Sequence, residues 1–249
     1  MFPLTHLTEI DSTNRWMRKH RTEKDRAVWA DFQTGGMGSG SNSWESEVSK
    51  NLLLSLLWHP NALLARDQFF ISMAVSLAIH EVVGRYVESD VCIKWPNDIY
   101  CGDRKVCGIL IENRLKGELI QDSIIGIGLN INQCVFVSDA PNPTSLSLLT
   151  QRILDRETVL SELLKSLDTC LEMADNAACH AMLHNTYHQQ LYRLNGVYPF
   201  RFEDGEVRDC LVEGVDRFGR LKLSWTQMEC GVEMHHHSNC EFKQVQFII

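Results

Sequence analysis

Hydrophobic residues in the first 150 positions fall into short runs separated by turn-forming residues, with one longer stretch at helical spacing. The short runs predict strands over residues 27–32, 52–58, 91–95, 105–114 and 119–131. The run at 52–58 is almost continuously apolar, which indicates a strand buried on both faces. The longer stretch, residues 68–87, predicts a packed helix. A short helix over residues 14–19, capped by Asp11 or Ser12, precedes them.

The last hundred residues follow a different pattern. Residues 155–190 predict more helix, because apolar side chains form one stripe at Val159, Leu160, Leu163, Leu164, Leu167 and Leu171. After a break at Asn195-Gly196, residues 197–249 predict short strands with turns at Asp204-Gly205, Phe218-Gly219 and Gly231. The pattern is typical of a small all-β module of SH3 size. We therefore expect an α+β protein with two domains, residues 1–192 and 193–249.

Composition narrows the function classes. The 249 residues are 44% hydrophobic and 22% charged, as in ordinary globular proteins. The net charge of −8 argues against a nucleic-acid binder that relies on phosphate contacts. Nine cysteines without a C-x-x-C pair indicate free thiols in a reducing compartment. No signal peptide is visible and no apolar run reaches the ~20 residues that span a bilayer, so we expect a cytoplasmic protein without membrane contact.

A glycine-rich loop follows the strand at 27–32. It contains Gly35, Gly36, Gly38 and Gly40, and such a loop lets backbone N–H groups approach an anionic ligand closely. The spacing matches neither the dinucleotide-binding fingerprint nor the P-loop. A flexible surface loop is an equal alternative on this segment alone.

Two lysines lie at the ends of predicted strands. Lys94 and Lys105 fall within twelve residues of each other, together with Asn97 and Asp98. A single lysine at a strand end usually extends its ammonium group into solvent. Two lysines at buried strand ends favour an anion site, because desolvation of the ammonium is otherwise unfavourable. Phosphoryl or adenylyl transfer needs such neutralisation of charged oxygens.

Five segments, taken in order, resemble the family of biotin–protein ligases. They are residues 11–14, residues 30–34 with the glycine loop and Trp44, residues 94–98, residues 104–112 and residues 126–132. The resemblance is strong over residues 5–150 and looser beyond. It implies a mixed β-sheet flanked by helices, similar to class II aminoacyl-tRNA synthetases, followed by an SH3-like β-barrel. It also implies the monofunctional form without an N-terminal DNA-binding domain.

The resemblance implies a two-step reaction. In such ligases the carboxylate of biotin attacks the α-phosphate of ATP, which arrives with Mg²⁺, and pyrophosphate leaves. A lysine of a biotin carboxyl carrier domain then takes biotin from the adenylate. The family implies a monomer or homodimer.

Site residues carry over from the resemblance position by position. Biotin contacts fall on Ser12, Thr13, Asn14, Gln33, Gly36, Met37, Gly38, Ser39, Lys105, Gly108 and Gly126. ATP contacts fall on Trp44, Lys94, Asn97, Lys105 and Asn130, and catalytic roles on Lys94, Asp98 and Lys105. Lys105 would offset the repulsion between the two anions, and Asp98 would orient or deprotonate the carrier lysine. No side chain is assigned to a metal.

One position departs from the family pattern. The loop usually carries an arginine where this sequence has Met37, and neither Ser39 nor Gly40 supplies a charge. A charge-assisted hydrogen bond contributes about 1.5–3 kcal/mol, so we predict weaker retention of the adenylate. An altered acid substrate or an inactive descendant are the other interpretations.

Two alternative functions remain open, and two groups of histidines raise the question of a metal site. A lipoate or octanoate ligase or transferase shares the fold, and Cys101 or Cys107 would be the transferase nucleophile. A non-catalytic biotin sensor is favoured by Met37 and opposed by the retained lysines. His180, His184 and His188 recur every four residues and His235, His236 and His237 are contiguous, but no H-E-x-x-H motif accompanies them, so we expect no metal site.

Overall fold

The computed structural model describes residues 2–40, 42–138, 140–229, 232–241 and 244–248. The first sheet is built from β1 (Leu4–Ile10), β2 (Arg26–Gln33), β3 (Leu52–Trp58), β4 (Val91–Lys94), β5 (Asp98–Cys101), β6 (Arg104–Lys116) and β7 (Leu119–Leu129). The second is built from β8 (Val197–Phe202), β9 (Val207–Val215), β10 (Leu221–Glu229), β11 (Val232–Cys240) and β12 (Val245–Phe247). The helices are α1 (Thr13–Lys19), α2 (Phe69–Gly84), α3 (Leu146–Thr150), α4 (Arg156–Asp175) and α5 (His180–Gln189), with 3₁₀ turns at Ala65–Asp67 and Ala177–Cys179.

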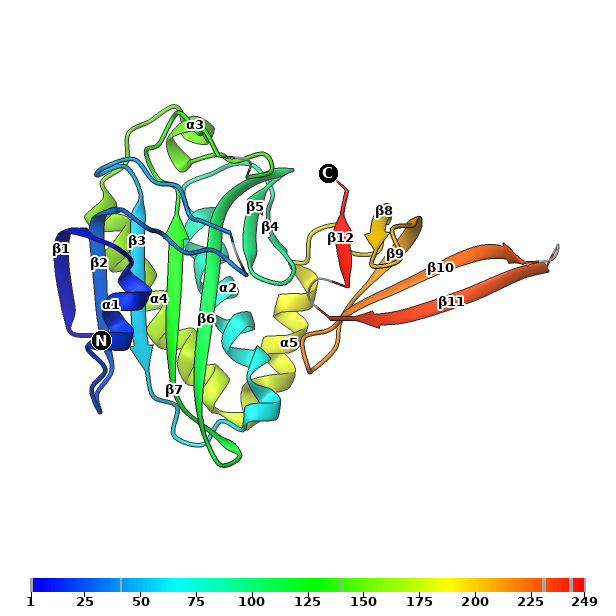
Figure 1. The fold of residues 1–249 in the computed structure, drawn as a ribbon, viewed down its shortest axis with the longest axis horizontal. Coiled ribbons are helices and arrows are strands. Elements are labelled where there is room, and N and C mark those ends of the chain that lie inside the picture. The colour runs from blue at the N-terminus through cyan, green and yellow to red at the C-terminus, as the bar shows by residue number, and fades with distance from the viewer. Residues whose placement is uncertain (1, 41, 139, 230–231, 242–243, 249) are drawn as a thin grey trace.

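The two sheets differ in pattern (Figure 1). The large one is a mixed seven-stranded sheet in the order β1-β2-β3-β7-β6-β5-β4, in which only β1 and β2 run parallel among the pairs described. The small one is a five-stranded antiparallel sheet in the order β11-β10-β9-β8-β12. The predicted α+β architecture, a helix-flanked mixed sheet followed by a small all-β module, is confirmed. The domain boundary at 192/193 stays a prediction.

Strand β3 shows how the large sheet separates its two faces. Leu52, Leu54 and Leu56 point into the main core beneath the helices, whereas Leu57 packs in a smaller cluster with Met17 of α1. The strand is therefore buried on both faces, as its continuous apolar sequence predicts. The helix layer thus covers one face, and α1 with the glycine loop covers the other.

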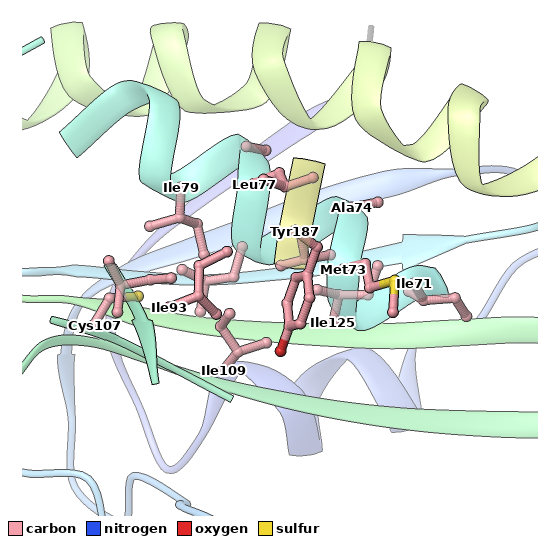
Figure 2. Close-up of a cluster of buried hydrophobic side chains, with 14 of the residues drawn as sticks. Ile71, Met73, Ala74, Leu77, Ile79, Ile93, Cys107, Ile109, Ile125 and Tyr187 are labelled. Carbon is pink, nitrogen blue, oxygen red and sulfur yellow. The ribbon is translucent and has the colours of Figure 1, made fainter. Parts of the chain in front are cut away.

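Helix α2 is the centre of the helix layer. It lies between the sheet and α4, so apolar side chains surround most of its circumference. Figure 2 shows this layer, in which side chains of α2 gather with Tyr187 of α5 against the strands; the labelled residues are Ile71, Met73, Ala74, Leu77, Ile79, Ile93, Cys107, Ile109, Ile125 and Tyr187. None of the helices in the described part of the chain is long and apolar enough to cross a membrane.

Polar residues set where the helices begin and end. Ser12 caps α1 by accepting a hydrogen bond from the Arg15 N–H at 3.5 Å. Asp155 caps α4 by accepting from the Thr158 N–H at 3.0 Å. The helical pattern predicted over 155–190 forms two helices, because α4 ends at Asp175 and a 3₁₀ turn precedes α5.

Three elements were not predicted: β1, β5 and α3. Strand β5 and helix α3 are too short to show a clear apolar pattern, and no residue of β1 is fully buried. The predicted turns at Gly205 and Gly219 carry positive φ angles of 84° and 87°, which glycine adopts without strain. The predicted turn at Gly231 lies outside the described residues.

The small sheet is tied to the large domain through side chains. Trp95 Nε1 donates to the carbonyl of Gly219 at 2.8 Å. On α5, the Nε2 atoms of His184 and His188 lie 2.9 Å and 3.0 Å from the carbonyls of Val215 and Glu213. Beyond these contacts the β10–β11 hairpin extends away from the large sheet (Figure 1).

Candidate active site

A pair of glycines forms the floor of the site on the face that α1 covers. Gly108 of β6 and Gly128 of β7 are direct cross-strand neighbours, and the Trp44 indole lies against both. A Cβ at Gly108 would come within 2.7 Å of the indole, and one at Gly128 would clash with it. Only glycine at both positions lets the ring approach the backbone this closely.

The glycine loop that leads to Trp44 folds back on itself. The Gly38 N–H donates to the Asn42 carbonyl at 2.8 Å, and the Trp44 N–H donates to the Gly36 carbonyl at 3.0 Å. Met37 and Ser43 form a bridge between these bonds. The predicted loop is therefore a short antiparallel turn over the sheet, although its Ser41 lies outside the described residues. Ser39 reaches a cavity of about 710 Å³ that also contacts Asn97 and Leu110.

A neutral hydrogen-bond network lies beside this floor. The backbone N–H and the hydroxyl of Thr13 both donate to Gln33 Oε1, at 2.7 Å and 3.0 Å. The hydroxyl of Ser55 lies 2.8 Å from Thr13 Oγ1 and 2.5 Å from Asn14 Oδ1. Because an amide oxygen only accepts, the Ser55 hydroxyl donates its single proton to Asn14. Gln33 turns its amide nitrogen toward the Gly36 backbone.

An ion pair holds the other side of the Asn14 amide. Asn14 Nδ2 donates to Glu112 Oε1 at 3.2 Å, and the Arg18 guanidinium donates to both oxygens of Glu112 at 2.6 Å and 2.7 Å. Burial alone would raise the pKa of Glu112, but the hydrogen bonds from Arg18 and Asn14 bring the pKa below its ordinary value. Both ends of the Asn14 amide are thus engaged inside the protein, and its oxygen leaves no room for a Cβ at Gly126.

The charged end of the site centres on Asp98. Its carboxylate lies 2.6 Å from Lys105 Nζ, and these side chains are only 15% and 19% exposed. Lys94 is the cross-strand neighbour of Asp98 on β4. Loop residues fix the Lys105 backbone, because its N–H donates to the Asn142 carbonyl and its carbonyl accepts from the Thr144 N–H, both at 2.8 Å. The Lys105 ammonium therefore pairs with this carboxylate, and the charge of Lys94 interacts with it from the adjacent strand.

Lys94 sits between aromatic rings. Its Nζ lies 5.3 Å from the Tyr100 ring centroid and 4.7 Å from that of Phe247. Burial lowers the pKa of the Lys94 ammonium, Asp98 opposes this, and the charges of Lys105 and Arg193 add to the lowering.

The two predicted asparagines have different surroundings. Asn97 closes the turn after β4, because its Nδ2 donates to the Ile109 carbonyl at 2.8 Å and its own carbonyl accepts from the Ile109 N–H at 2.9 Å. Asn130 donates from Nδ2 to the Thr144 carbonyl at 2.9 Å. Its buried Oδ1 has no hydrogen-bond partner within the described residues. An unpaired buried oxygen is unfavourable, so this atom suits a cation or a ligand donor.

The cysteines do not favour a thiolate nucleophile. Cys101 and Cys107 are buried, and burial raises the pKa of Cys101 to about 11 and that of Cys107 further. Across the described ranges, no cluster of three His, Cys, Asp or Glu side chains is placed to hold a metal ion. The ring nitrogens of His180, His184 and His188 lie against backbone carbonyls instead.

The structure gathers most of the predicted residues on one face of the large sheet, in a neutral group and a charged group. The neutral group contains Thr13, Asn14 and Gln33, and the charged group contains Lys94, Asp98 and Lys105. Ser12 uses its hydroxyl as a helix cap. Ser55, Glu112 and Phe247 were not among the predicted residues, because each acts through a partner distant in sequence.

Comparison with known proteins gives a consistent result. Residues 5–130, about half of the chain, match the model of the Biotin/lipoate A/B protein ligase family. The chain is 31% identical over 174 residues to the bifunctional ligase/repressor BirA of Escherichia coli, covering 67% of this chain and 53% of BirA. It is 28% identical over 198 residues to a biotin–[acetyl-CoA-carboxylase] ligase of Mycobacterium tuberculosis, covering 78% and 71% of the two chains.

A solved structure has the same fold. The biotin protein ligase from Aquifex aeolicus, in complex with biotin and ATP, superposes with a TM-score of 0.77 at 22% identity, covering all of both chains. The chain spans about half the length of the first curated relatives that it matches, 53% in the case of the E. coli protein.

Proposed function

Because the chain belongs to the Biotin/lipoate A/B protein ligase family, we propose that it is a biotin–protein ligase. It activates biotin with ATP as biotinyl-adenylate and transfers the biotin to a lysine of a biotin carboxyl carrier domain. The observation that carries this proposal is the Lys105–Asp98 ion pair with Lys94 opposite it on β4, next to a neutral hydrogen-bond network.

The charged group suits the first step. The carboxylate of biotin and the α-phosphate of ATP repel each other, and two fixed ammonium groups in a partly buried site offset that repulsion. A carboxylate oxygen attacks the α-phosphorus, and pyrophosphate leaves with its electron pair. Lys105 faces the meeting point of the two anions, and its hydrogen bond to Asp98 fixes its direction.

The neutral group suits the other end of biotin. A ureido ring is uncharged and needs donors and acceptors in a fixed order, which Thr13 and Gln33 supply without adding charge. Beneath them, the Ser55 hydroxyl donates to Asn14 Oδ1 and lies 2.8 Å from Thr13 Oγ1. This end therefore contributes selectivity, and the charged end contributes rate.

The second step uses Asp98 in another role. The amine of the carrier lysine attacks the acyl carbon, AMP leaves, and the amine loses a proton. Asp98 orients that amine and accepts the proton as the bond forms. Mg²⁺ would arrive with ATP and neutralise its phosphates, and Asn130 Oδ1, which no described residue binds, fits a role as one of its oxygen ligands.

A matched set of acids tests the proposal. The protein is incubated with Mg-ATP and a purified carrier domain together with biotin, lipoate or octanoate. Pyrophosphate release and the intact mass of the carrier are measured. We expect a gain of one biotin on a single lysine, with pyrophosphate formed only with biotin. Transfer of lipoate or octanoate instead would assign the other branch of the family. Biotin binding without pyrophosphate release would indicate a sensor.

A further inference from the structure

The Lys94 ammonium occupies an aromatic box to which both sheets contribute. Tyr100 comes from β5 of the large sheet, and Phe247 comes from β12, the last strand of the small sheet. The Phe247 ring is the nearer of the two, at 4.7 Å from Nζ. Lys94 thus links a catalytic position to a residue more than 150 positions away in sequence.

The ring of Phe247 is itself held in place. It is 9% exposed and packs against Phe200 at a centroid distance of 4.7 Å and against Tyr192 at 5.9 Å. The Tyr192 hydroxyl in turn donates to Asp103 at 2.6 Å. The box is therefore built from packed rings and does not depend on a mobile surface contact.

From this arrangement we propose that Phe247 is a positioning residue for the Lys94 ammonium, so that the small sheet takes part in adenylate formation. The proposal rests on the proposed ligase function for its rate consequence. The face of an aromatic ring attracts a cation, and this attraction is strongest where water is excluded.

The box also decides which ammonium Asp98 binds. Asp98 faces Lys94 from β5, and the charges that act on Lys94 are those of Asp98, Lys105 and Arg193. With the ring in place, Lys94 stays between Phe247 and Tyr100, and the Asp98 carboxylate pairs with Lys105 at 2.6 Å. Without the ring, the Lys94 ammonium loses its attraction to β12 and is no longer held in a fixed place beside the Asp98–Lys105 pair. Phe247 thereby keeps the ammonium groups of Lys94 and Lys105 apart, so that one can face the carboxylate of biotin and the other the phosphate of ATP.

Three variants separate this role from simple packing. Phe247→Leu keeps an apolar side chain but removes the ring, and Phe247→Tyr keeps the ring. Phe202→Leu makes the same replacement on the neighbouring strand β8, where the ring packs against Trp225. We expect Phe247→Leu to lower kcat for pyrophosphate release by roughly 2- to 30-fold, the range of a cation–π contact. The KM for biotin should stay unchanged, and the other two variants should remain within twofold of wild type.

The alkaline limb of the pH profile adds a second readout. Loss of the ring removes stabilisation of the charged form, so the pKa of Lys94 falls further below its ordinary value and kcat declines at lower pH. A purely structural defect would lower kcat without moving this limb. Equal kcat in Phe247→Leu and wild type, or equal losses in Phe247→Leu and Phe202→Leu, overturns the proposal.

NMR of the lysine side chains tests the box without any activity. In ¹³C-lysine-labelled protein the Lys94 ε-protons should be shifted upfield by the rings, in wild type and Phe247→Tyr but less in Phe247→Leu. An unshifted Lys94 signal overturns the box even if the ligase is active. An upfield signal in a protein that makes no pyrophosphate leaves the box standing but overturns the ligase function and, with it, the catalytic role of Phe247.

Discussion

The two ends of the site hold their polar atoms in opposite ways. At the neutral end, the Thr13 hydroxyl donates to Gln33 and the Ser55 hydroxyl donates to Asn14, and each bond contributes about 1 kcal/mol with little dependence on salt. At the charged end, Asp98 and Lys105 pair in a partly buried position, where removing one partner leaves an uncompensated charge. Lesions at the neutral end should therefore affect binding, and lesions at the charged end should affect rate.

Replacing Lys105 should have the largest effect of the substitutions considered, and it should act on the rate of adenylate formation. Lys105→Met keeps the length of the side chain but removes the charge that faces both anions and leaves Asp98 with Lys94 as its neighbour. We expect single-turnover adenylate formation to fall roughly 100- to 1000-fold, as for the loss of one preorganised donor to a developing charge.

The control for Lys105→Met is Lys116→Met at the exposed end of the same strand, which should leave the rate unchanged. Biotin affinity, measured by calorimetry without ATP, should change less than tenfold. A loss of affinity as large as the loss of rate would contradict the division between the two ends.

A substitution in the glycine-rich loop tests the effect of adding a positive charge to the neutral end. Met37→Arg restores the basic side chain expected in such ligases, next to the Gly36 and Gly38 turn. We expect adenylate dissociation, followed by stopped-flow fluorescence, to slow roughly 10- to 150-fold, the effect of one charge-assisted hydrogen bond. The matched control is Met182→Arg, on the exposed side of α5. Unchanged release in Met37→Arg would mean that the loop does not face the phosphate.

Two buried serines sharpen the comparison inside the neutral end. Ser55→Ala leaves the buried Asn14 oxygen without its donor, so we expect the free energy of unfolding to fall by about 1–3 kcal/mol. The KM for biotin should rise roughly tenfold at unchanged kcat. Ser76→Ala is the control, because the hydroxyl of Ser76 has no hydrogen-bond partner in the described ranges. Equal destabilisation in both variants would contradict the network.

The smallest effect is expected at Glu112, which binds Asn14 of the neutral end, and it concerns the pH dependence of the free energy of unfolding. Its pKa is lowered below the ordinary 4.5 by hydrogen bonds that outweigh burial. A carboxyl group with a depressed pKa in the folded state stabilises the protein above its unfolded pKa and loses that contribution as pH falls through the folded value. Glu112→Gln should therefore flatten the decline of the urea-unfolding free energy below pH 4.5. Glu118→Gln, on the exposed β6–β7 turn, should follow wild type.

The sequence predicted the framework of the fold because its strands are apolar and bounded by turn residues. Residues 52–58 were identified as a doubly buried strand, yet the same apolar run concealed the role of Ser55. That role depends on Asn14, which is 41 positions away. A buried hydroxyl can be distinguished from a tolerated one only when its partner is known, as the contrast with Ser76 illustrates.

Long-range contacts account for the other residues that were missed. Lys94 and Lys105 were identified from their places at strand ends, and the structure brings both to Asp98. Phe247 carries no local signal, since aromatic residues near the end of a β module usually fill its core. Strands β1 and β5 escaped detection because β1 lies at a sheet edge and β5 has only four residues.

The glycines beneath Trp44 allow the space above the sheet to change in one direction only. Gly108 and Gly128 have no side chain to remove, so every substitution there adds atoms and shortens the space above the sheet. A side chain at either glycine would push the indole away from the sheet, whereas a smaller residue in place of Trp44 would open the space above both glycines. In the proposed ligase, position 44 is therefore the place where a mutation can make room for a larger acid.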